Sequence, residues 1–232
     1  MGDCLAEGVE RFLASLSEAQ GLSAIGGSAT ATIVDAPAAL PTLLVGRSYA
    51  GEGDGYAIFR LSLSRAATSD VGIALTLQNG VGRGSAVSGT DFGSAIEVSS
   101  DGVNWTAASA ATFAAGQTQL WARVAVLADN VPNPAYGETS TTPAPQFLNI
   151  EGHESFSLTA TVTTGASALA NGAKPVSGTG TIVDATANGG RPLVWVDDVV
   201  VHEDGTAILT VSRSRVEAGV ASVRLKTADR RA

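Results

Sequence analysis

Residues 150–156 read I-E-G-H-E-S-F, and this stretch decides the fold because the chain contains it twice. A close copy, E-G-V-E-R-F, stands at residues 7–12 near the N-terminus. Both copies have Glu, Gly, Glu and Phe in the same order and at the same spacing, and 144 residues separate them. Such a match indicates an internal repeat, whose period has to be established before any single element is interpreted.

Each copy is followed by the same kind of tail. Residues 28–36 read S-A-T-A-T-I-V-D-A and residues 177–185 read S-G-T-G-T-I-V-D-A, an offset of 149 residues. A period of about 150 residues is the length of a whole domain and far exceeds one turn of a solenoid. We therefore interpret the chain as a window onto a tandem array of domains.

Composition favours an all-β class for these domains. Of the 232 residues, 44% are hydrophobic, which is enough for a sizeable core, and the length allows one or two domains. The 27 glycines and the abundance of Thr, Ser, Val and Ala favour short strands joined by turns. The chain has almost no long amphipathic pattern of the kind that predicts helices.

Charge and cysteine content exclude several classes of protein. The formal net charge of -8 argues against a nucleic-acid partner, whose phosphates require a basic surface, and is compatible with cation binding. The single cysteine, Cys4, cannot form an internal disulfide. No apolar run predicts a transmembrane segment in this window, and no pattern predicts a signal peptide. The protein is therefore either intracellular or exported by a signal outside this window.

The repeat divides the chain into five segments. Residues 1–36 form the second half of one repeat, and residues 42–186 form a complete repeat. Residues 193–232 open a third repeat, because H-E-D-G-T-A-I-L-T-V-S-R-S echoes the earlier G-E-G-D-G-Y-A-I-F-R-L-S-L-S-R. The linkers between them, residues 37–41 and 187–192, contain Pro or Gly. We expect both partial repeats to be less ordered than the complete one or to pack irregularly.

Alternation of apolar and polar residues predicts the strands of the complete repeat. It is clearest at residues 56–64, 119–127 and 156–163, where every second residue is apolar. We therefore expect one antiparallel β-sandwich over residues 42–186, with a core that includes Phe59, Leu61, Val124, Val126, Phe156 and Leu158.

The first partial repeat has a second interpretation. Its apolar residues also fit one face of a helix, so the sequence leaves open whether residues 1–36 form strand or helix. The residues concerned are Leu5, Val9, Phe12, Leu13 and Leu16.

The order of the motifs resembles Calx-beta repeats, the calcium-binding modules of sodium–calcium exchangers and of many large bacterial surface adhesins. The matching motifs span nearly all of residues 42–186, and the Thr-rich strand after Glu154 is more similar to the adhesin branch. The resemblance implies an immunoglobulin-like antiparallel β-sandwich of about seven strands, with calcium bound at one end. The motifs are G-E-G-D-G-Y-A, S-G-T-D-F, A-A-G-Q-T, V-L-A-D-N, E-G-H-E-S-F-S-L-T and G-T-G-T-I-V-D.

Calcium requires six to eight oxygen ligands, which clustered Asp and Glu side chains at strand ends supply. Glu151 and Glu154 would point to opposite faces of a regular strand, so we expect the chain to turn at Gly152 before a strand begins at Phe156. The family resemblance assigns the metal ligands Asp129, Asn130, Glu151, Glu154 and Asp184, with first-repeat equivalents Asp3, Glu7, Glu10 and Asp35.

The chain departs from the family at this site. Consecutive aspartates are usual in the family, whereas this chain has Ala128-Asp129-Asn130 and Asp184-Ala185-Thr186. The acid that precedes the first strand in the family has no counterpart in L-L-V-G-R-S-Y. Fewer carboxylates imply weaker binding or fewer ions. In the alternative interpretation, the same acids only solvate loops and cap turns.

Other candidate sites are weaker. His153 and His202 are far apart, lack a third ligand for zinc and are expected to be solvated loop residues. Paired acids such as Glu151 and Glu154 also occur in glycosidases, but no substrate cleft is predicted here. Trp121 is expected to be partly exposed and to contact a neighbouring side chain or, alternatively, a sugar.

Together these observations predict a non-enzymatic, calcium-binding structural or interaction repeat of a longer adhesin-like protein, outside the cell or on its surface. Its expected partners are neighbouring repeats of the same chain and a host or matrix protein or glycan, and no nucleic acid. The alternative is a metal-free sandwich that binds carbohydrate or protein.

Overall fold

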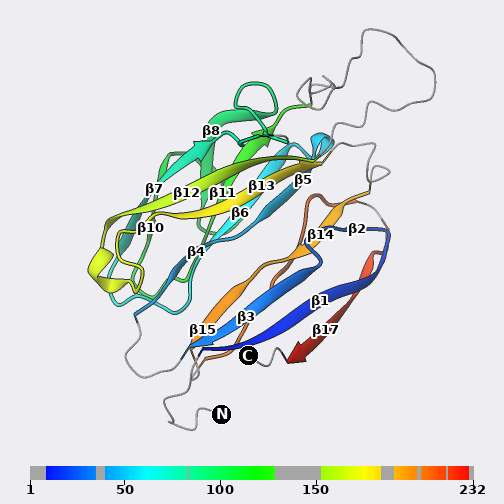
Figure 1. The fold of residues 1–232 in the computed structure, drawn as a ribbon. Helices are drawn as coiled ribbons and strands as arrows, with labels where there is room; N and C mark the ends of the chain where they lie inside the picture. The colour runs from blue at the N-terminus through cyan, green and yellow to red at the C-terminus, as the bar shows by residue number, and fades with distance from the viewer. Residues whose placement is uncertain are drawn as a thin grey trace, which may run out of the picture.

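The computed structural model describes residues 9–34, 40–82, 84–128, 153–183, 191–202, 205–217 and 219–229. Within these ranges the regular elements are strands, apart from two short 3-10 turns, η1 (Glu52–Asp54) and η3 (Ala166–Ala168). No helix among the described residues is long and apolar enough to cross a membrane. The strands form two bodies, which Figure 1 shows side by side. The predicted all-β class is confirmed.

The first body, called the central sandwich here, comprises the described residues between 43 and 183, which are 43–82, 84–128 and 153–183. Two five-stranded sheets make it up, with strand orders β10-β7-β12-β13-β5 and β4-β6-β11-β8-β9. The strands are β4 (Leu43–Val45), β5 (Ser48–Gly51), β6 (Tyr56–Leu63), β7 (Val71–Gln78), β8 (Phe92–Ser99), β9 (Thr106–Ala107), β10 (Ala110–Phe113), β11 (Gln119–Val126), β12 (Glu154–Thr164) and β13 (Val176–Val183). The strand count exceeds the expected seven because several strands are short pieces, such as β4 and β5, each of which is an edge strand of a different sheet.

The core of the central sandwich lies between the two sheets. All six residues that the sequence assigns to the core are buried, from fully enclosed Phe59 to Val126 at 7% exposed. The ring of Phe156 from one sheet stacks on Phe92 of the other at 4.2 Å between centroids and meets Phe59 edge-on at 5.7 Å. Full burial of one such side chain is worth about 1.5–3 kcal/mol, so this aromatic cluster is a main contributor to stability.

One pairing differs from the expected antiparallel sandwich. β13 pairs with β5 in parallel, with Gly180 opposite Ser48, while the other ladders of the central sandwich are antiparallel. A Cβ atom at Gly180 would lie 2.6 Å from the ring of Phe156, and one at Gly178 would lie 2.2 Å from the carbonyl oxygen of Gly46. The glycines of the S-G-T-G-T tail therefore let β13 approach both the core and the edge of the sheet.

The second body, called the terminal unit, is built from both ends of the chain. It comprises residues 10–34 and 193–229, whose strands form two sheets with the orders β15-β3-β1-β17 and β16-β14-β2. The strands are β1 (Glu10–Gln20), β2 (Ser23–Ala24), β3 (Ser28–Val34), β14 (Leu193–Val196), β15 (Val199–His202), β16 (Val211–Arg213) and β17 (Ser222–Asp229). Residues 10–20 are therefore strand and not helix. The two ends of the chain pair with each other through β1 and β17, with an irregularity in the register between Ser17 and Gln20.

The pairings of the terminal unit follow those of the central sandwich. β1 pairs with β3 as β12 pairs with β13, with Glu10 opposite Ile33 and Glu154 opposite Ile182. β1 pairs with β17 as β12 pairs with β7. The parallel pairing of β15 with β3 matches that of β5 with β13. Strands from opposite ends of the chain thus adopt the arrangement that one continuous segment adopts in the centre.

A buried polar cluster joins the two bodies. Asp197 of the terminal unit is 6% exposed and accepts a hydrogen bond from the backbone N–H of Arg47 at 3.1 Å. The guanidinium of Arg47 donates to the carbonyl oxygens of Ser28 and Val196, each at 3.1 Å. Burial raises the pKa of Asp197, and the nearby positive charges of Arg47 and Arg60 oppose that rise. Burial also lowers the pKa of Arg60.

Candidate metal centre at one end of the central sandwich

Several strand ends meet at one end of the central sandwich. Glu154 begins β12 opposite Ile182, and the next residue of β13, Val183, lies opposite Gly51 at the end of β5. The backbone N–H of Val126, at the end of β11, donates to the carbonyl oxygen of Gly55 at 3.0 Å. In Figure 1 this end carries η1, the short cyan coil. The acidic positions expected to bind metal lie within three residues of these strand ends in the sequence.

Most of the predicted ligands lie outside the described residues. These are Asp129, Asn130, Glu151 and Asp184, together with the first-repeat residues Asp3, Glu7 and Asp35. Two predicted ligands are described, Glu154 at the start of β12 and Glu10 at the start of β1. Glu154 is 7% exposed, whereas Glu10 is exposed. The structure therefore brings no two of the predicted ligands together within its described ranges.

Glu154 lies in a strand, whereas the sequence predicted that it lies in a turn before the strand. The strand begins at Glu154 itself and not at Phe156. Because side chains alternate along a strand, Glu154 shares the inward face of β12 with Phe156 and Leu158, both of which are buried. Its carboxyl group therefore lies at the mouth of the core between the sheets, and not on an exposed loop.

The sequence interpretation missed a second buried carboxylate at this end, that of Asp54. Its side chain is 1% exposed and accepts a hydrogen bond from the N–H of Gly51 at 2.7 Å. It also forms an ion pair with Arg215 of the terminal unit, with Nη1 and Oδ1 2.5 Å apart. Contacts with Glu217 and Asp54 raise the pKa of Arg215. The motif G-E-G-D-G carried the signal, but the sequence alone does not reveal that Asp54 folds inward.

The described residues supply part of a calcium shell at most. No group of three or more His, Cys, Asp or Glu side chains comes together among them. A buried carboxylate at a strand end, as in Glu154, has the oxygen chemistry that calcium prefers, but six to eight oxygens are needed. Asp54 is already engaged by Gly51 and Arg215. A complete site thus requires ligands beyond the described ranges.

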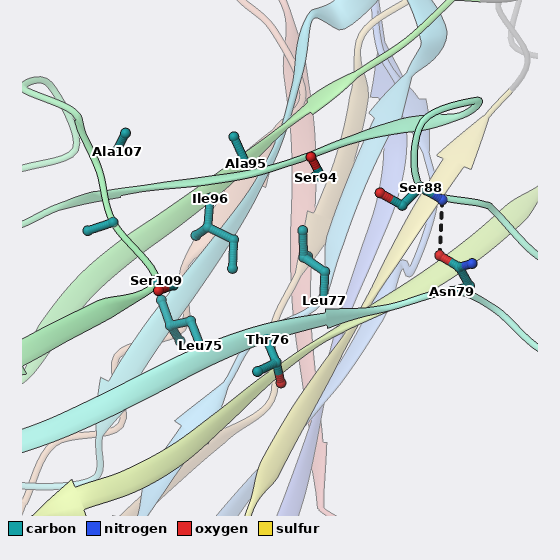
Figure 2. Close-up of a pocket in the computed structure, with 11 residues that line it drawn as sticks. Leu75, Thr76, Leu77, Asn79, Ser88, Ser94, Ala95, Ile96, Ala107 and Ser109 are labelled. Carbon is teal, nitrogen blue, oxygen red and sulfur yellow. Dashed lines mark hydrogen bonds between the residues drawn. The ribbon is translucent and has the colours of Figure 1, made fainter.

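A hollow on the side of the sandwich is the second candidate site (Figure 2). It has a volume of about 580 Å³ and lies between β7 on one sheet and β8 and β9 on the other. Asn79 accepts a hydrogen bond from the N–H of Ser88 at its rim, 3.0 Å away. The lining consists of small polar and aliphatic residues with no ionisable or aromatic side chain: Leu75, Thr76, Leu77, Asn79, Ser88, Ser94, Ala95, Ile96, Ala107, Ala108 and Ser109. Such a lining offers neither an acid–base pair nor a stacking surface for sugar.

The aromatic residues near β11 contact neighbouring side chains. Arg123 lies over the rings of Tyr56 at 3.9 Å and Trp105 at 4.4 Å, and its Nε is 2.6 Å from Glu97. Trp121 is partly exposed, as expected, and its ring lies beside Gly102, where an added Cβ atom would be 3.8 Å away. The cation–π partners of Arg123 are thus Tyr56, at the start of β6, and Trp105, which directly precedes β9.

The two histidines differ from each other. His153 is exposed, in agreement with the expected solvated position. His202 is not solvated, because it is 3% exposed at the end of β15 and its Nε2 lies 3.3 Å from the hydroxyl of Ser64. The expectation is therefore wrong for His202, which packs where the two bodies meet.

Comparisons with known proteins return structural neighbours alone. No family model and no curated protein matches the chain. Among solved structures, it is similar to CBD12 from CALX1.2 (17% identity, TM-score 0.39, 62% of this chain and 45% of that chain). It is also similar to the apo-form Calx CBD1 domain (17%, 0.40, 62% and 97%) and to the calcium binding domain CBD12 of CALX1.1 (18%, 0.38, 60% and 42%). The match thus spans less than half of either CBD12 chain.

Proposed function

We propose that this protein is a calcium-binding β-sandwich module whose role is structural or interactive and not enzymatic. The observation that carries the proposal is the meeting of the ends of β5, β11 and β13 with the start of β12 at one end of the sandwich. The buried carboxylate of Glu154 lies there. The acids next along the chain from these strand ends, Asp129, Glu151 and Asp184, complete the proposed ligand set together with Asn130.

The chain is further proposed to be part of a tandem array. Two observations support this organisation. The copied motifs and their tails lie at similar offsets, 144 and 149 residues, and the strand pairings of the two bodies correspond. Calcium at the end of β13 would link this last strand of the domain to the segment that contains Glu151 and Glu154. In an extracellular adhesin-like protein, this would fix the direction in which the next domain leaves, because a short linker with Gly189 and Gly190 does not set an angle alone.

The metal-free alternative has less support. A sugar-binding sandwich normally offers exposed aromatic rings or a polar cleft. The hollow beside β7 has small polar residues but no aromatic ring, and Arg123 is occupied by Tyr56, Trp105 and Glu97. The function as a calcium module is therefore the one that the described residues favour.

The decisive experiment is calorimetric titration of the whole chain with calcium after chelation, compared with magnesium. We expect the wild-type chain to bind calcium. We expect Glu154→Gln to lose most of that affinity, because it keeps the shape of the side chain but removes a charged ligand. Glu97→Gln is the matched control, because Glu97 lies beside Arg123 on β8 and away from the strand ends of the proposed site. No calcium-dependent heat in the wild type, or equal affinity in Glu154→Gln and Glu97→Gln, refutes the assignment.

A further inference from the structure

The two bodies contact each other through equivalent segments of two repeats. The motif G-E-G-D-G-Y-A-I-F-R-L-S-L-S-R and its echo H-E-D-G-T-A-I-L-T-V-S-R-S share D-G and a later S-x-S, which gives an offset of 150 residues for β6. Arg213 is therefore the counterpart of Leu63. In the strand ladders, Leu43 lies opposite Leu63 and Val194 lies opposite Arg213, so Val194 is the counterpart of Leu43.

The parallel ladders give the same correspondence. Ser48 lies opposite Gly180 in one ladder, and Val199 lies opposite Ala31 in the other. Gly180 and Ala31 occupy the same place in the two copied tails, so Val199 is the counterpart of Ser48. Both ladders thus give an offset of 151 residues for β4, β5 and the turn between them.

Two residues of the central sandwich contact their own counterparts in the terminal unit. Nη2 of Arg47 lies 3.8 Å from Oδ1 of Asp198, the residue at the same place in the other segment. Nη1 of Arg60 donates a hydrogen bond to the hydroxyl of Thr210, its counterpart on the other side. Contact between a residue and its own counterpart is the mark of a two-fold relation, in which both partners use the same patch. The interface between the two bodies is therefore of this self-matching kind.

Contacts away from the axis agree with this two-fold relation. The guanidinium of Arg47 donates a hydrogen bond to the carbonyl oxygen of Ser28, which belongs to the tail of the first copy. The reciprocal pair consists of Asp198 and Ser177, the counterparts of Arg47 and Ser28. Both line one cavity of about 210 Å³ between the bodies. The same two positions thus approach each other in both directions across the interface.

Charge distinguishes the two sides of this interface. In a pair of identical central sandwiches, Arg47 would face Arg47 and Arg60 would face Arg60. The terminal unit instead has Asp198 and Thr210 at these positions. Nε of Arg60 is buried and has no hydrogen-bond partner among the described residues, so this guanidinium is already incompletely compensated. A second guanidinium opposite it would be strongly unfavourable, because like charges placed face to face exclude a partner.

We propose that β4, β5, β6 and the turn between β4 and β5 form a repeat-docking surface, which binds the same surface of a second repeat and selects it by charge. The accepted repeat has acids at the positions of Gly46 and Arg47 and a short hydroxyl side chain at the position of Arg60. Asp197 is the acid at the position of Gly46, and it accepts the hydrogen bond from the backbone N–H of Arg47. A second copy of the central sandwich is rejected.

The proposal uses the repeat organisation proposed above and does not depend on calcium binding. Its test is a double-mutant cycle in the full chain, read out by amide hydrogen exchange in NMR spectra. The backbone amide of Arg47 reports the contact, because its acceptor is Asp197 of the other body. Thr210→Arg places a guanidinium opposite Arg60, as in a pair of identical repeats, and should raise the exchange rate of this amide by roughly tenfold or more.

The second half of the cycle restores the opposite-sided arrangement. Adding Arg60→Thr to Thr210→Arg exchanges the two side chains across the two-fold axis. The double variant should return the exchange rate of the Arg47 amide to within about threefold of the wild type. An unchanged rate in Thr210→Arg, or no recovery in the double variant, overturns the proposal.

Two further variants separate charge from other causes. Thr210→Gln adds length without charge and should leave the exchange rate within about threefold of the wild type. Thr227→Arg adds the same charge at an exposed residue of β17, opposite Ala14 of β1, and should leave the rate unchanged. Equal acceleration by Thr210→Gln and Thr210→Arg would show that size selects the partner, which overturns selection by charge.

The amides of β1 and β12 report whether each body stays folded. If Thr210→Arg also exposes the amides of β1, the double variant decides alone: recovery of protection supports the proposal, and its absence overturns it. Calcium takes no part in these measurements, so a negative result here leaves the calorimetric test of the calcium site unaffected.

Discussion

Equivalent residues behave differently in the central sandwich and in the terminal unit. Glu154 and Glu10 both begin a strand and both lie opposite an isoleucine of the next strand, yet Glu154 is buried and Glu10 is exposed. Phe156 is 2% exposed, while Phe12 is half-buried. The Glu-x-Phe pattern and the register are shared, and among the described residues only the central sandwich has the strands β8 and β11 in its second sheet. We attribute the difference in burial to these two strands. Burial of a carboxylate at this end is thus a property of the completed sandwich.

The largest expected difference between the two bodies concerns these phenylalanines. Phe156→Ala should lower the stability of the central sandwich by about 3–5 kcal/mol, because it removes the ring that Phe59 and Phe92 contact. Phe12→Ala, the matched change in the terminal unit, should cost about 1 kcal/mol, typical of a site that is only half-buried. Differential scanning calorimetry measures both. Equal losses for the two variants would contradict the difference in packing.

Calcium should distinguish the two carboxylates. At one hundred times its dissociation constant, calcium should stabilise the central sandwich by about 2.7 kcal/mol, and Glu154→Gln should remove most of that gain. Glu10→Gln should leave it intact, because Glu10 is exposed on the body that lacks the covering strands. Melting temperatures recorded with calcium and with chelator give the answer. A larger loss from Glu10→Gln than from Glu154→Gln would exclude Glu154 as a principal ligand.

Equivalent substitutions in the two tails, residues 177–185 and residues 28–36, should change stability by different amounts. Gly180→Ala should destabilise the central sandwich by about 1–3 kcal/mol, since the new methyl group would lie 2.6 Å from the Phe156 ring. The equivalent position of the terminal unit already holds an alanine, Ala31, which is fully buried. Ala31→Gly should therefore cost only about 0.5–1 kcal/mol. Urea unfolding compares the two, and a neutral Gly180→Ala would indicate that the ring moves away freely.

The smallest expected effect is the pH dependence of the contact between the bodies. Burial raises the pKa of Asp197 above its unfolded value of about 3.9, so the folded state holds its proton more tightly than the unfolded state does. The stability contribution of Asp197 is therefore fully present below that unfolded pKa and is lost as the pH rises through the raised pKa.

The substitution Asp197→Asn should flatten this slope, while Asp198→Asn is the control, because the Asp198 side chain is 67% exposed. Thermal unfolding at a series of pH values from about 4 to 7 measures the slope. An unchanged slope in Asp197→Asn would assign the pH dependence to other groups.

The features of the fold that could be predicted from the sequence are those that repeated motifs and alternating apolar residues encode. Period-2 patterns identified the six core residues of the central sandwich, and the copied motifs anticipated that β12 and β1 occupy equivalent places. The inward turn of Asp54 was not predicted, because its partner Arg215 is 161 residues away in the sequence. The pairing of the two chain ends was missed for the same reason, since no local pattern encodes a contact between residue 12 and residue 229.

The parallel and antiparallel pairings also determine how the molecule responds to a stretching force. Phe12 lies opposite Asp229, so a pull on these two positions opens the β1–β17 ladder from one end, one hydrogen bond after another. β5 and β13 run in parallel, with Ser48 opposite Gly180 and Gly51 opposite Val183, so a pull between Ser48 and Val183 shears their ladder as a whole. Single-molecule pulling should record a weak event from the terminal unit before a strong one from the central sandwich. The terminal unit would then act as an extensible element in series with a stiff one.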